Sequence, residues 1–163
     1  MKRISVIILL LLNSQILICQ NSILTNVKAE NLNGELISLA DCYKNGPLYI
    51  DFWALWCQPC LAEIKALQGI ENEFKDKDVT IIGINIDSPK GLAKVKSFIS
   101  SWEISYPILL DPNSQIFNKL NGQYLPYSIL FDTNGKIVKI RTGFQMGDEK
   151  SIKEDILKLI KRE

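Results

Sequence analysis

The stretch that decides the fold is residues 48–60, which read LYIDFWALWCQPC. Its first part, 48–53, is a near-continuous apolar and aromatic run, typical of a strand buried on both faces of a sheet. Asp51 is the polar exception in that run. Residues 59–74 follow with apolar side chains at helical spacing, and Pro59 suits the first helical turn, where a missing N–H is tolerated. The stretch therefore predicts a buried strand that leads directly into an amphipathic helix.

Sequence patterns on either side of this unit predict further strands and helices. Asn33-Gly34 is a strong hairpin signal between two short strands at 27–30 and 36–38. The other predicted elements are a helical turn at 39–43, a buried strand at 79–86, a helix at 88–100, an extended segment at 106–110, a short helix at 115–120, a hairpin of strands 128–131 and 136–142, and an amphipathic helix at 148–161. A strand–helix–strand unit implies a parallel pair, and a hairpin adds antiparallel strands. The predicted fold class is α/β, a mixed central sheet flanked by helices, with an N-terminal β hairpin.

Composition excludes several kinds of function. The chain has 163 residues, a length that suggests one domain, and its formal net charge of +1 provides no basic excess for binding nucleic acid. It contains no histidine. Catalysis by Ser-His or Cys-His pairs is therefore excluded, as are histidine-ligated zinc and copper sites. Any acid–base chemistry must use Asp, Glu, Cys, Lys or Tyr side chains.

The N-terminus has the pattern of an export signal. A basic pair at 2–3 precedes an unbroken apolar run at 4–12, which is much shorter than the roughly 20 apolar residues of a transmembrane helix. We therefore expect a signal peptide at 1–19 and one domain at 20–163, in a protein exported to the periplasm or cell envelope of a bacterium. Two alternatives stay open, a retained membrane anchor and a lipoprotein acylated at Cys19. The bulky residue before that cysteine argues against lipidation.

The four cysteines are Cys19, Cys42, Cys57 and Cys60. The last two stand three residues apart at the start of the predicted helix, where free N–H groups and the positive end of the helix dipole stabilise a thiolate. A C-x-x-C between a buried strand and an amphipathic helix indicates a redox-active pair. Cys42 is left over, and we expect it to be a small buried apolar residue.

Other uses of the C-x-x-C pair fit the sequence less well. A zinc site would need a second cysteine pair or histidines, and haem attachment would need a histidine where Leu61 stands. A purely structural disulfide would stabilise little, because the entropic gain grows with the length of the closed loop. The sequence therefore predicts no metal and no cofactor.

Several segments in order resemble one known family. Residues 51–60 closely resemble the active-site segment of thioredoxins, and 106–111, 125–128 and 131–138 are similar to the exported TlpA/ResA-like branch of that superfamily. The resemblance covers about residues 28–160. It implies a thioredoxin-like fold with an N-terminal hairpin and a thiol–disulfide oxidoreductase. It also implies protein substrates with disulfides or thiols and a membrane electron donor.

The resemblance assigns roles to individual residues. It implies that Cys57 is the attacking thiol and that Cys60 resolves the mixed disulfide. It implies a cis peptide at Leu125-Pro126, which would face the disulfide and pair with an extended segment of the substrate. Trp56 would form part of the docking surface.

Two carboxylates are candidates for moving the proton of the resolving thiol. Asp51 interrupts a buried strand, where an ionised carboxylate is costly unless partnered, and burial raises its pKa. In thioredoxins the aspartate six residues before the first cysteine has this role. Glu63 lies one helical turn after Cys60, where TlpA/ResA-like reductases use a glutamate. From the residues alone, Glu63 would be a solvated helix residue, and the sequence leaves open which carboxylate acts.

The preferred function is the reduction of protein disulfides, for example in apocytochromes c or wrongly formed disulfides. A disulfide oxidant or isomerase is the alternative within the same chemistry. A thiol peroxidase is disfavoured, because Ala54 stands where its motif needs Thr or Ser. A metal-binding chaperone of the same fold, such as a copper chaperone, would need a histidine ligand and a C-x-x-x-C spacing, and the chain has neither.

Overall fold

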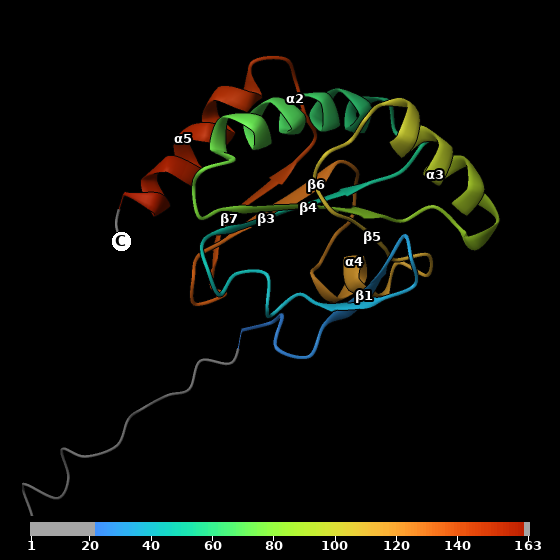
Figure 1. The fold of residues 1–163 in the computed structure, drawn as a ribbon, viewed down its shortest axis with the longest axis horizontal. Coiled ribbons are helices and arrows are strands. Elements are labelled where there is room, and N and C mark those ends of the chain that lie inside the picture. Colours follow the sequence, from blue (N-terminus) through green and yellow to red (C-terminus); the bar gives the residue numbers. More distant parts are fainter. Residues whose placement is uncertain (1–21, 162–163) are drawn as a thin grey trace, which may run out of the picture.

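The computed structural model of the protein describes residues 22–161. In that part of the chain seven strands form one sheet in the order β2-β1-β5-β4-β3-β6-β7 (Figure 1). The strands are β1 (Lys28–Asn31), β2 (Leu36–Ser38), β3 (Leu48–Trp53), β4 (Thr80–Asn85), β5 (Ile108–Leu110), β6 (Tyr127–Phe131) and β7 (Ile137–Thr142). The β3–β4 and β4–β5 pairings are parallel and the others antiparallel. The predicted mixed sheet and the N-terminal hairpin, β1–β2, are confirmed.

Helices cover both faces of the sheet. Figure 1 shows α2 (Gln58–Phe74), α3 (Leu92–Ser101) and α5 (Asp148–Ile160) on one face, and α4 (Gln115–Lys119) with the N-terminal hairpin region on the other. Each face buries its own apolar cluster, one beneath α2, α3 and α5 and one beneath α4. The cluster beneath α2 contains the two cysteines of the C-x-x-C motif, so we call that side the disulfide face.

Strand β3 runs through the middle of the sheet, between β4 and β6, and all six of its residues are buried. Successive side chains of a strand point to opposite faces. Tyr49 and Trp53 lie in the cluster on the disulfide face, and the alternation places Asp51 on that face with them. The polar member of the buried run is therefore aimed at the layer beneath the cysteines.

Helix α2 begins directly after β3 because the sequence supplies a suitable start. Cys57 is its N-cap residue, with extended backbone angles, and Pro59 occupies the first turn. The buried side of the helix is formed by residues at three- and four-residue spacing. They are Cys60, Glu63, Ile64, Leu67, Ile70 and Phe74. The helix therefore carries a glutamate in its otherwise apolar stripe.

The shorter predicted elements differ from the structure in their bounds. Residues 39–43 form hydrogen-bonded turns without a helix. The predicted helix at 88–100 divides into a 3-10 turn, Pro89–Gly91, and α3. The extended segment at 106–110 contributes only β5 to the sheet, and Pro107 has no N–H to donate to a ladder.

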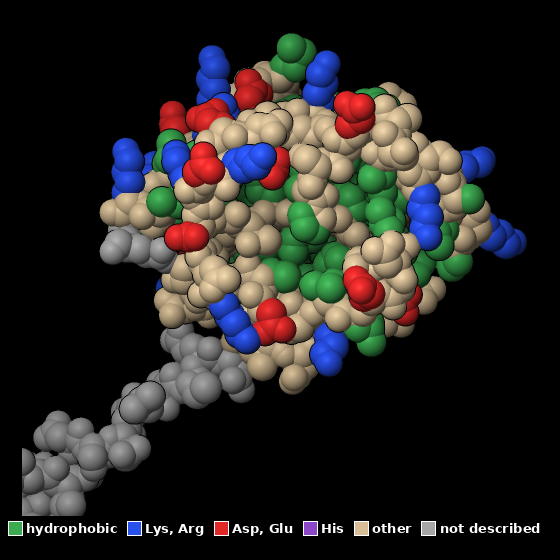
Figure 2. All heavy atoms as spheres, viewed as in Figure 1, with side chains coloured by type: hydrophobic (Ala, Val, Ile, Leu, Met, Phe, Trp, Pro, Cys, Tyr) green, Lys and Arg blue, Asp and Glu red, His purple; other side chains and the backbone are tan. Residues whose placement is uncertain are grey.

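The predicted export signal at 1–19, including Cys19, lies outside the described residues. Within 22–161 no helix is both long enough and apolar enough to cross a membrane. In the orientation of Figure 1, Figure 2 shows Lys and Arg side chains interspersed with Asp and Glu around the outline, and hydrophobic side chains gathered near the middle. No charge of a single sign dominates this visible face, which agrees with a net charge of +1.

Candidate active site

A disulfide joins Cys57 and Cys60 at the start of α2, with an S–S distance of 2.02 Å. The Cys57 sulfur accepts a hydrogen bond from the Cys60 backbone N–H at 3.3 Å, which is the position of a helix cap. The first turn of α2 holds no acidic residue. The positive end of the helix dipole is therefore not neutralised there, and a Cys57 thiolate would be stabilised by it.

The two cysteines differ slightly in burial. Cys57 is 4% exposed and Cys60 is completely buried. Cys57 is therefore the more accessible of the two cysteines. Trp56, the residue before it, is 68% exposed and projects from the surface beside the disulfide. An exposed tryptophan of this size is a suitable contact for a partner protein.

The peptide between Leu125 and Pro126 is cis, so this prediction is confirmed. Pro126 is buried, and Leu125 packs against the apolar cluster that contains the disulfide. The two residues that follow lie on opposite faces of β6. Tyr127 belongs to the cluster beneath α4 and donates a hydrogen bond to the Leu120 carbonyl, while Ser128 lies on the disulfide face.

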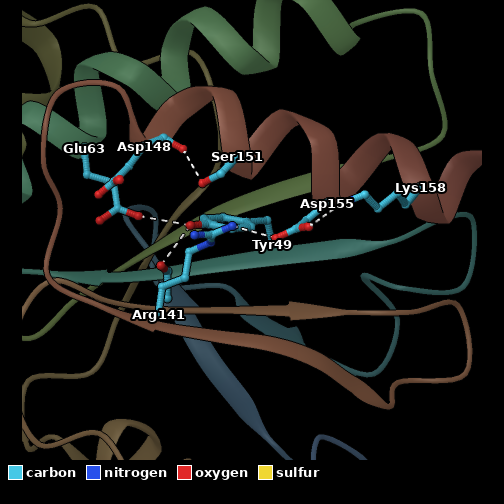
Figure 3. Close-up of polar contacts among 8 residues, drawn as sticks. Tyr49, Glu63, Arg141, Asp148, Ser151, Asp155 and Lys158 are labelled. Atoms are coloured by element: carbon cyan, nitrogen blue, oxygen red, sulfur yellow. Dashed lines mark hydrogen bonds and ion pairs between the residues drawn. The ribbon is translucent and has the colours of Figure 1, made fainter.

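Glu63 is buried, with 1% of its surface exposed, so it is not the solvated helix residue that the sequence alone suggested. Its Oε1 lies 3.1 Å from the hydroxyl of Tyr49 (Figure 3). That hydroxyl lies 2.8 Å from Oγ of Ser128. A hydroxyl has one proton and can also accept. When Glu63 is ionised, Tyr49 can donate to it while accepting from Ser128.

Burial raises the pKa of Glu63 to about 7. The hydrogen bond from Tyr49, the nearby hydroxyl of Ser128 and the positive charge of Arg141 oppose that rise, and the negative charge of Asp148 adds to it. A carboxyl group with a pKa near neutrality can both take and return a proton at physiological pH. The arrangement therefore suits Glu63 to proton transfer.

Asp51 is completely buried, and neither of its carboxyl oxygens has a hydrogen-bond partner. Its neighbours across the sheet are Gly83 on β4 and Ser128 on β6. Burial, and next the negative charge of Glu63, raise the pKa of Asp51 well above its ordinary value. Of the two carboxyl groups Glu63 has the hydrogen bonds and the nearby cation, so it is the one that ionises first.

Other polar groups on the disulfide face also lack partners. In the described part of the chain, the buried side-chain polar atoms without a hydrogen bond are both oxygens of Asp51, one oxygen of Glu63, Nε1 of Trp53 and the hydroxyl of Tyr106. A Cβ at Gly83 would come within 3.0 Å of Trp53 Nε1 and 3.2 Å of the Tyr106 ring. The missing side chain at Gly83 thus lets both rings approach the strand position next to Asp51. Unpartnered buried polar groups are rare in native proteins, and here they gather on the disulfide face around the two carboxyl groups.

Cys42, the free cysteine among the described residues, lies away from this site. It is half-buried against the cluster beneath α4, on the opposite face of the sheet, and its thiol donates to the Ser38 carbonyl at 3.4 Å. It therefore serves as a small packing residue. Between residues 22 and 161 no three Cys, Asp or Glu side chains come together in a way that could hold a metal ion.

Sequence reasoning missed Tyr49, Ser128, Arg141 and Asp148 as neighbours of Glu63. One of them had a signal, because Tyr49 stands two residues before Asp51 and strand alternation places both on the same face. The other three come from β6, β7 and α5, which the fold alone brings to Glu63.

Comparison with known proteins agrees with this geometry. Residues 21–140 match the AhpC/TSA family. The chain belongs to this thioredoxin-like family. It is 31% identical over 144 residues to the thiol-disulfide oxidoreductase ResA of Bacillus subtilis, an alignment that covers 88% of this chain and 77% of that protein. These matches and the C-x-x-C disulfide identify the chain as a thiol–disulfide oxidoreductase.

Two solved structures extend the comparison. A thioredoxin-like protein from Porphyromonas gingivalis superposes with a TM-score of 0.70 at 31% identity, covering 83% of this chain and 90% of that one. The exposed lipoprotein thioredoxin Etrx1 of Streptococcus pneumoniae superposes with a TM-score of 0.66 at 27% identity, covering 84% and 98%. The predicted thioredoxin-like fold is therefore confirmed.

Proposed function

We propose that this oxidoreductase reduces disulfide bonds of other proteins in the cell envelope, through a dithiol–disulfide cycle of Cys57 and Cys60. The observation that supports the proposal most directly is the position of Glu63. It is a buried carboxyl group one helical turn after Cys60, and its pKa is about 7. A resolving thiol that must lose a proton inside a nearly closed site needs such an acceptor.

The cycle begins with both cysteines reduced. The Cys57 thiolate attacks one sulfur of the substrate disulfide, so that a mixed disulfide forms and the other substrate sulfur leaves as a thiolate. Cys60 then gives its proton to the carboxylate of Glu63 and attacks the sulfur of Cys57. The bond between Cys57 and the substrate breaks, the second substrate thiolate leaves, and the Cys57–Cys60 disulfide remains. Two electrons have passed to the substrate, and a donor must return two electrons to the protein.

Asp51 has a different part in this scheme. Because its carboxyl group has no hydrogen-bond partner and lies near Glu63, it holds its proton after Glu63 has ionised. Its neutral form keeps a second negative charge out of the layer beneath the disulfide, which favours ionisation of Glu63. Asp51 is therefore a group that supports the proton acceptor.

The surface around Cys57 is where we place the substrate. The exposed indole of Trp56 would contact the partner protein beside the disulfide, and the backbone at Leu125 and Pro126 would pair with an extended substrate segment. Main-chain pairing recognises an extended strand with little dependence on its sequence, which suits an enzyme that acts on several proteins.

We further propose that residues 1–19 are an export signal and that residues 20–163 form the working domain outside the cytoplasm. The similarity to an exposed lipoprotein of Streptococcus pneumoniae supports this location. An exported reductase has no access to cytoplasmic reductants, so a membrane protein that carries electrons outward is the expected donor.

The reduction potential of the Cys57–Cys60 couple tests the direction of electron flow. Equilibration with glutathione or dithiothreitol should give a value near or below about −270 mV, as in thioredoxin, together with catalysed reduction of insulin disulfides. A value near about −120 mV, as in a strong oxidant, would contradict the proposed direction and favour a disulfide oxidant.

A further inference from the structure

Glu63 has neighbours on a second side, towards the edge strand β7 and helix α5. A pocket of about 250 Å³ lies between the start of α2, strand β7 and the start of α5. Its lining includes Glu63, Arg141 on β7 and Asp148 on α5, and its rim includes the exposed residues Lys139 and Thr142. The carboxyl group that we assign to proton transfer therefore borders a pocket that opens at the surface between β7 and α5.

The pocket places opposite charges beside Glu63. Arg141 is held by an ion pair with Asp155 of α5, at 2.6 Å, and both side chains are about three-quarters buried. Asp148 stands in the first turn of α5, where its carboxylate accepts the Gln145 N–H at 2.8 Å. Figure 3 shows the side chains of Glu63 and Asp148 next to each other, with Arg141 approaching from β7 below them. Both charged groups are thus fixed by other contacts before they act on Glu63.

The central strands β3 and β6 supply a hydrogen-bonded pair of hydroxyl groups, one of which contacts the same carboxyl group. Tyr49 lies between Glu63 and Ser128, and burial and the charge of Glu63 raise the pKa of the Tyr49 hydroxyl well above its ordinary value. Tyr49 therefore keeps its proton and remains a donor in the physiological range.

We propose that Tyr49 and Ser128 on the central strands, and Arg141 and Asp148 in the pocket, are positioning residues that set the proton affinity of Glu63 and so the pH range of the reductase. The proposal rests on the role of Glu63 in the proposed function. The titratable or charged groups around Glu63 are Tyr49 and Asp51 from β3, Tyr106 from the segment before β5, Arg141 and the rim residue Lys139 from β7, and Asp148 from α5. Some of these groups favour the ionised form of Glu63 and others favour the protonated form. Substitutions among them should therefore shift the titration midpoint of Glu63 upward in some variants and downward in others.

The directions follow from the contacts. Tyr49→Phe, Ser128→Ala and Arg141→Gln each remove a group that favours the ionised form, so each should raise the Glu63 midpoint. Asp148→Asn removes a like charge and should lower it, and an asparagine oxygen can still accept from Gln145. We expect shifts of at least about half a pH unit, which is modest for a hydrogen bond or a charge at close range.

The test is the pH profile of insulin reduction, together with a ¹³C NMR titration of the labelled glutamate carboxyl groups in the oxidised protein. Lys158→Gln is the matched control for Arg141→Gln. Lys158 also forms an ion pair with Asp155, at 3.2 Å, so this substitution removes a positive charge from the same partner. Lys158 lies ten residues after Asp148, however, which places it about 15 Å further along α5 from the pocket. Tyr127→Phe is the control for Tyr49→Phe, because it removes a hydrogen-bonded hydroxyl on the opposite face of the sheet.

Neither control should move the midpoint, and Arg141→Lys, which keeps the charge, should restore the wild-type value. The NMR titration follows Glu63 directly, so a variant with a lower melting temperature still gives a result. Glu63→Gln separates the two proposals. If it leaves the pH profile unchanged, the proposed role of Glu63 is wrong. If it abolishes the midpoint while the four substitutions do not shift it, the role stands and the positioning proposal is overturned.

Discussion

Asp51 and Ser128 lie directly opposite each other in the antiparallel pairing of β3 with β6. The Ser128 hydroxyl also contacts the hydroxyl of Tyr49, which is hydrogen-bonded to Glu63. One serine therefore lies between Asp51 on β3 and the hydroxyl that contacts Glu63 on α2. Two carboxyl groups from the successive elements β3 and α2 thus share one buried layer. Their ionisation is therefore linked, and the experiments below distinguish the part that each takes.

The first prediction concerns the two cysteines. Cys57→Ser should reduce insulin reduction to the uncatalysed rate, because the attacking thiolate is gone. Cys60→Ser should keep the first attack and lose the second, so a mixed disulfide between Cys57 and the substrate should accumulate. Non-reducing gel electrophoresis after mixing with oxidised substrate would reveal that adduct.

Cys42→Ser is the matched control, because Cys42 lies on the opposite face of the sheet from the disulfide. It should leave both the activity and the adduct pattern of the Cys60 variant unchanged. Full activity in Cys57→Ser, or an adduct that needs Cys42, would contradict the proposed order of attack.

The second prediction concerns stability and pH. The folded state raises the pKa of Glu63 from 4.5 to about 7, so the unfolded chain ionises first as the pH rises. The stability contributed by the protonated form is complete below about pH 4.5 and is lost between about pH 4.5 and 7. Glutamine does not ionise, so the Glu63→Gln variant should not lose stability as the pH rises. The substitution should therefore stabilise the oxidised protein above pH 7 by up to about 3 kcal/mol and have little effect near pH 4.

Urea unfolding of the oxidised protein at pH 4 and pH 8 would measure this difference. The exposed residue Glu154 on α5 offers a control, since Glu154→Gln removes the same charge without changing a buried group. An equal effect of Glu63→Gln at both pH values would mean that folding does not raise the pKa of Glu63.

The contrast between Asp51 and Glu63 shows how far the sequence could go. The position of Asp51 in an apolar run predicted that it is buried, because a strand in the middle of a mixed sheet has no face exposed to solvent. Glu63 gave no such signal. A single glutamate among helix residues fits the solvent side equally well, and only the packing of α2 against β3 and α5 places it inside. Resemblance to a family, rather than periodicity, pointed to it.

Arg141 illustrates what sequence could not provide. It lies 78 positions after Glu63, and its effect depends on the register of β7 against β6 and on the ion pair with Asp155. Such contacts depend on how separate elements pack, and a pattern within one element carries no record of them. The strands, the long helices and the redox pair were predictable because each is encoded in one continuous segment.

The third prediction concerns the proton on Asp51. Because Asp51 has no hydrogen-bond partner and an ionised Glu63 disfavours a second charge, Asp51 should keep its proton at a pH just above the midpoint at which Glu63 ionises. Infrared spectroscopy of the oxidised protein at that pH should show the C=O stretch of a buried carboxylic acid. The band should vanish in Asp51→Asn and persist in Glu63→Gln. A band that instead disappears with Glu63 would reverse the order of ionisation.

The fourth prediction concerns the space beside Asp51. In Gly83→Ala the added methyl group would lie 2.6 Å from Ile108 Cδ1 and 3.0 Å from Trp53 Nε1, closer than packed atoms tolerate. The rings next to Asp51 must then move, at a cost of about 1–3 kcal/mol. We expect a lower melting temperature, together with a changed Asp51 carbonyl band in the infrared spectrum.

Gly69→Ala provides the contrasting substitution. Gly69 lies inside α2, and a Cβ there would meet no atom within 4 Å. Alanine should therefore stabilise the helix by about 0.5–1 kcal/mol, because it restricts the unfolded chain and favours helical geometry. The Asp51 band should stay as in the wild type. If Gly83→Ala also left that band and the melting temperature unchanged, the close approach of Trp53 and Tyr106 to this position would not be needed for the arrangement around Asp51.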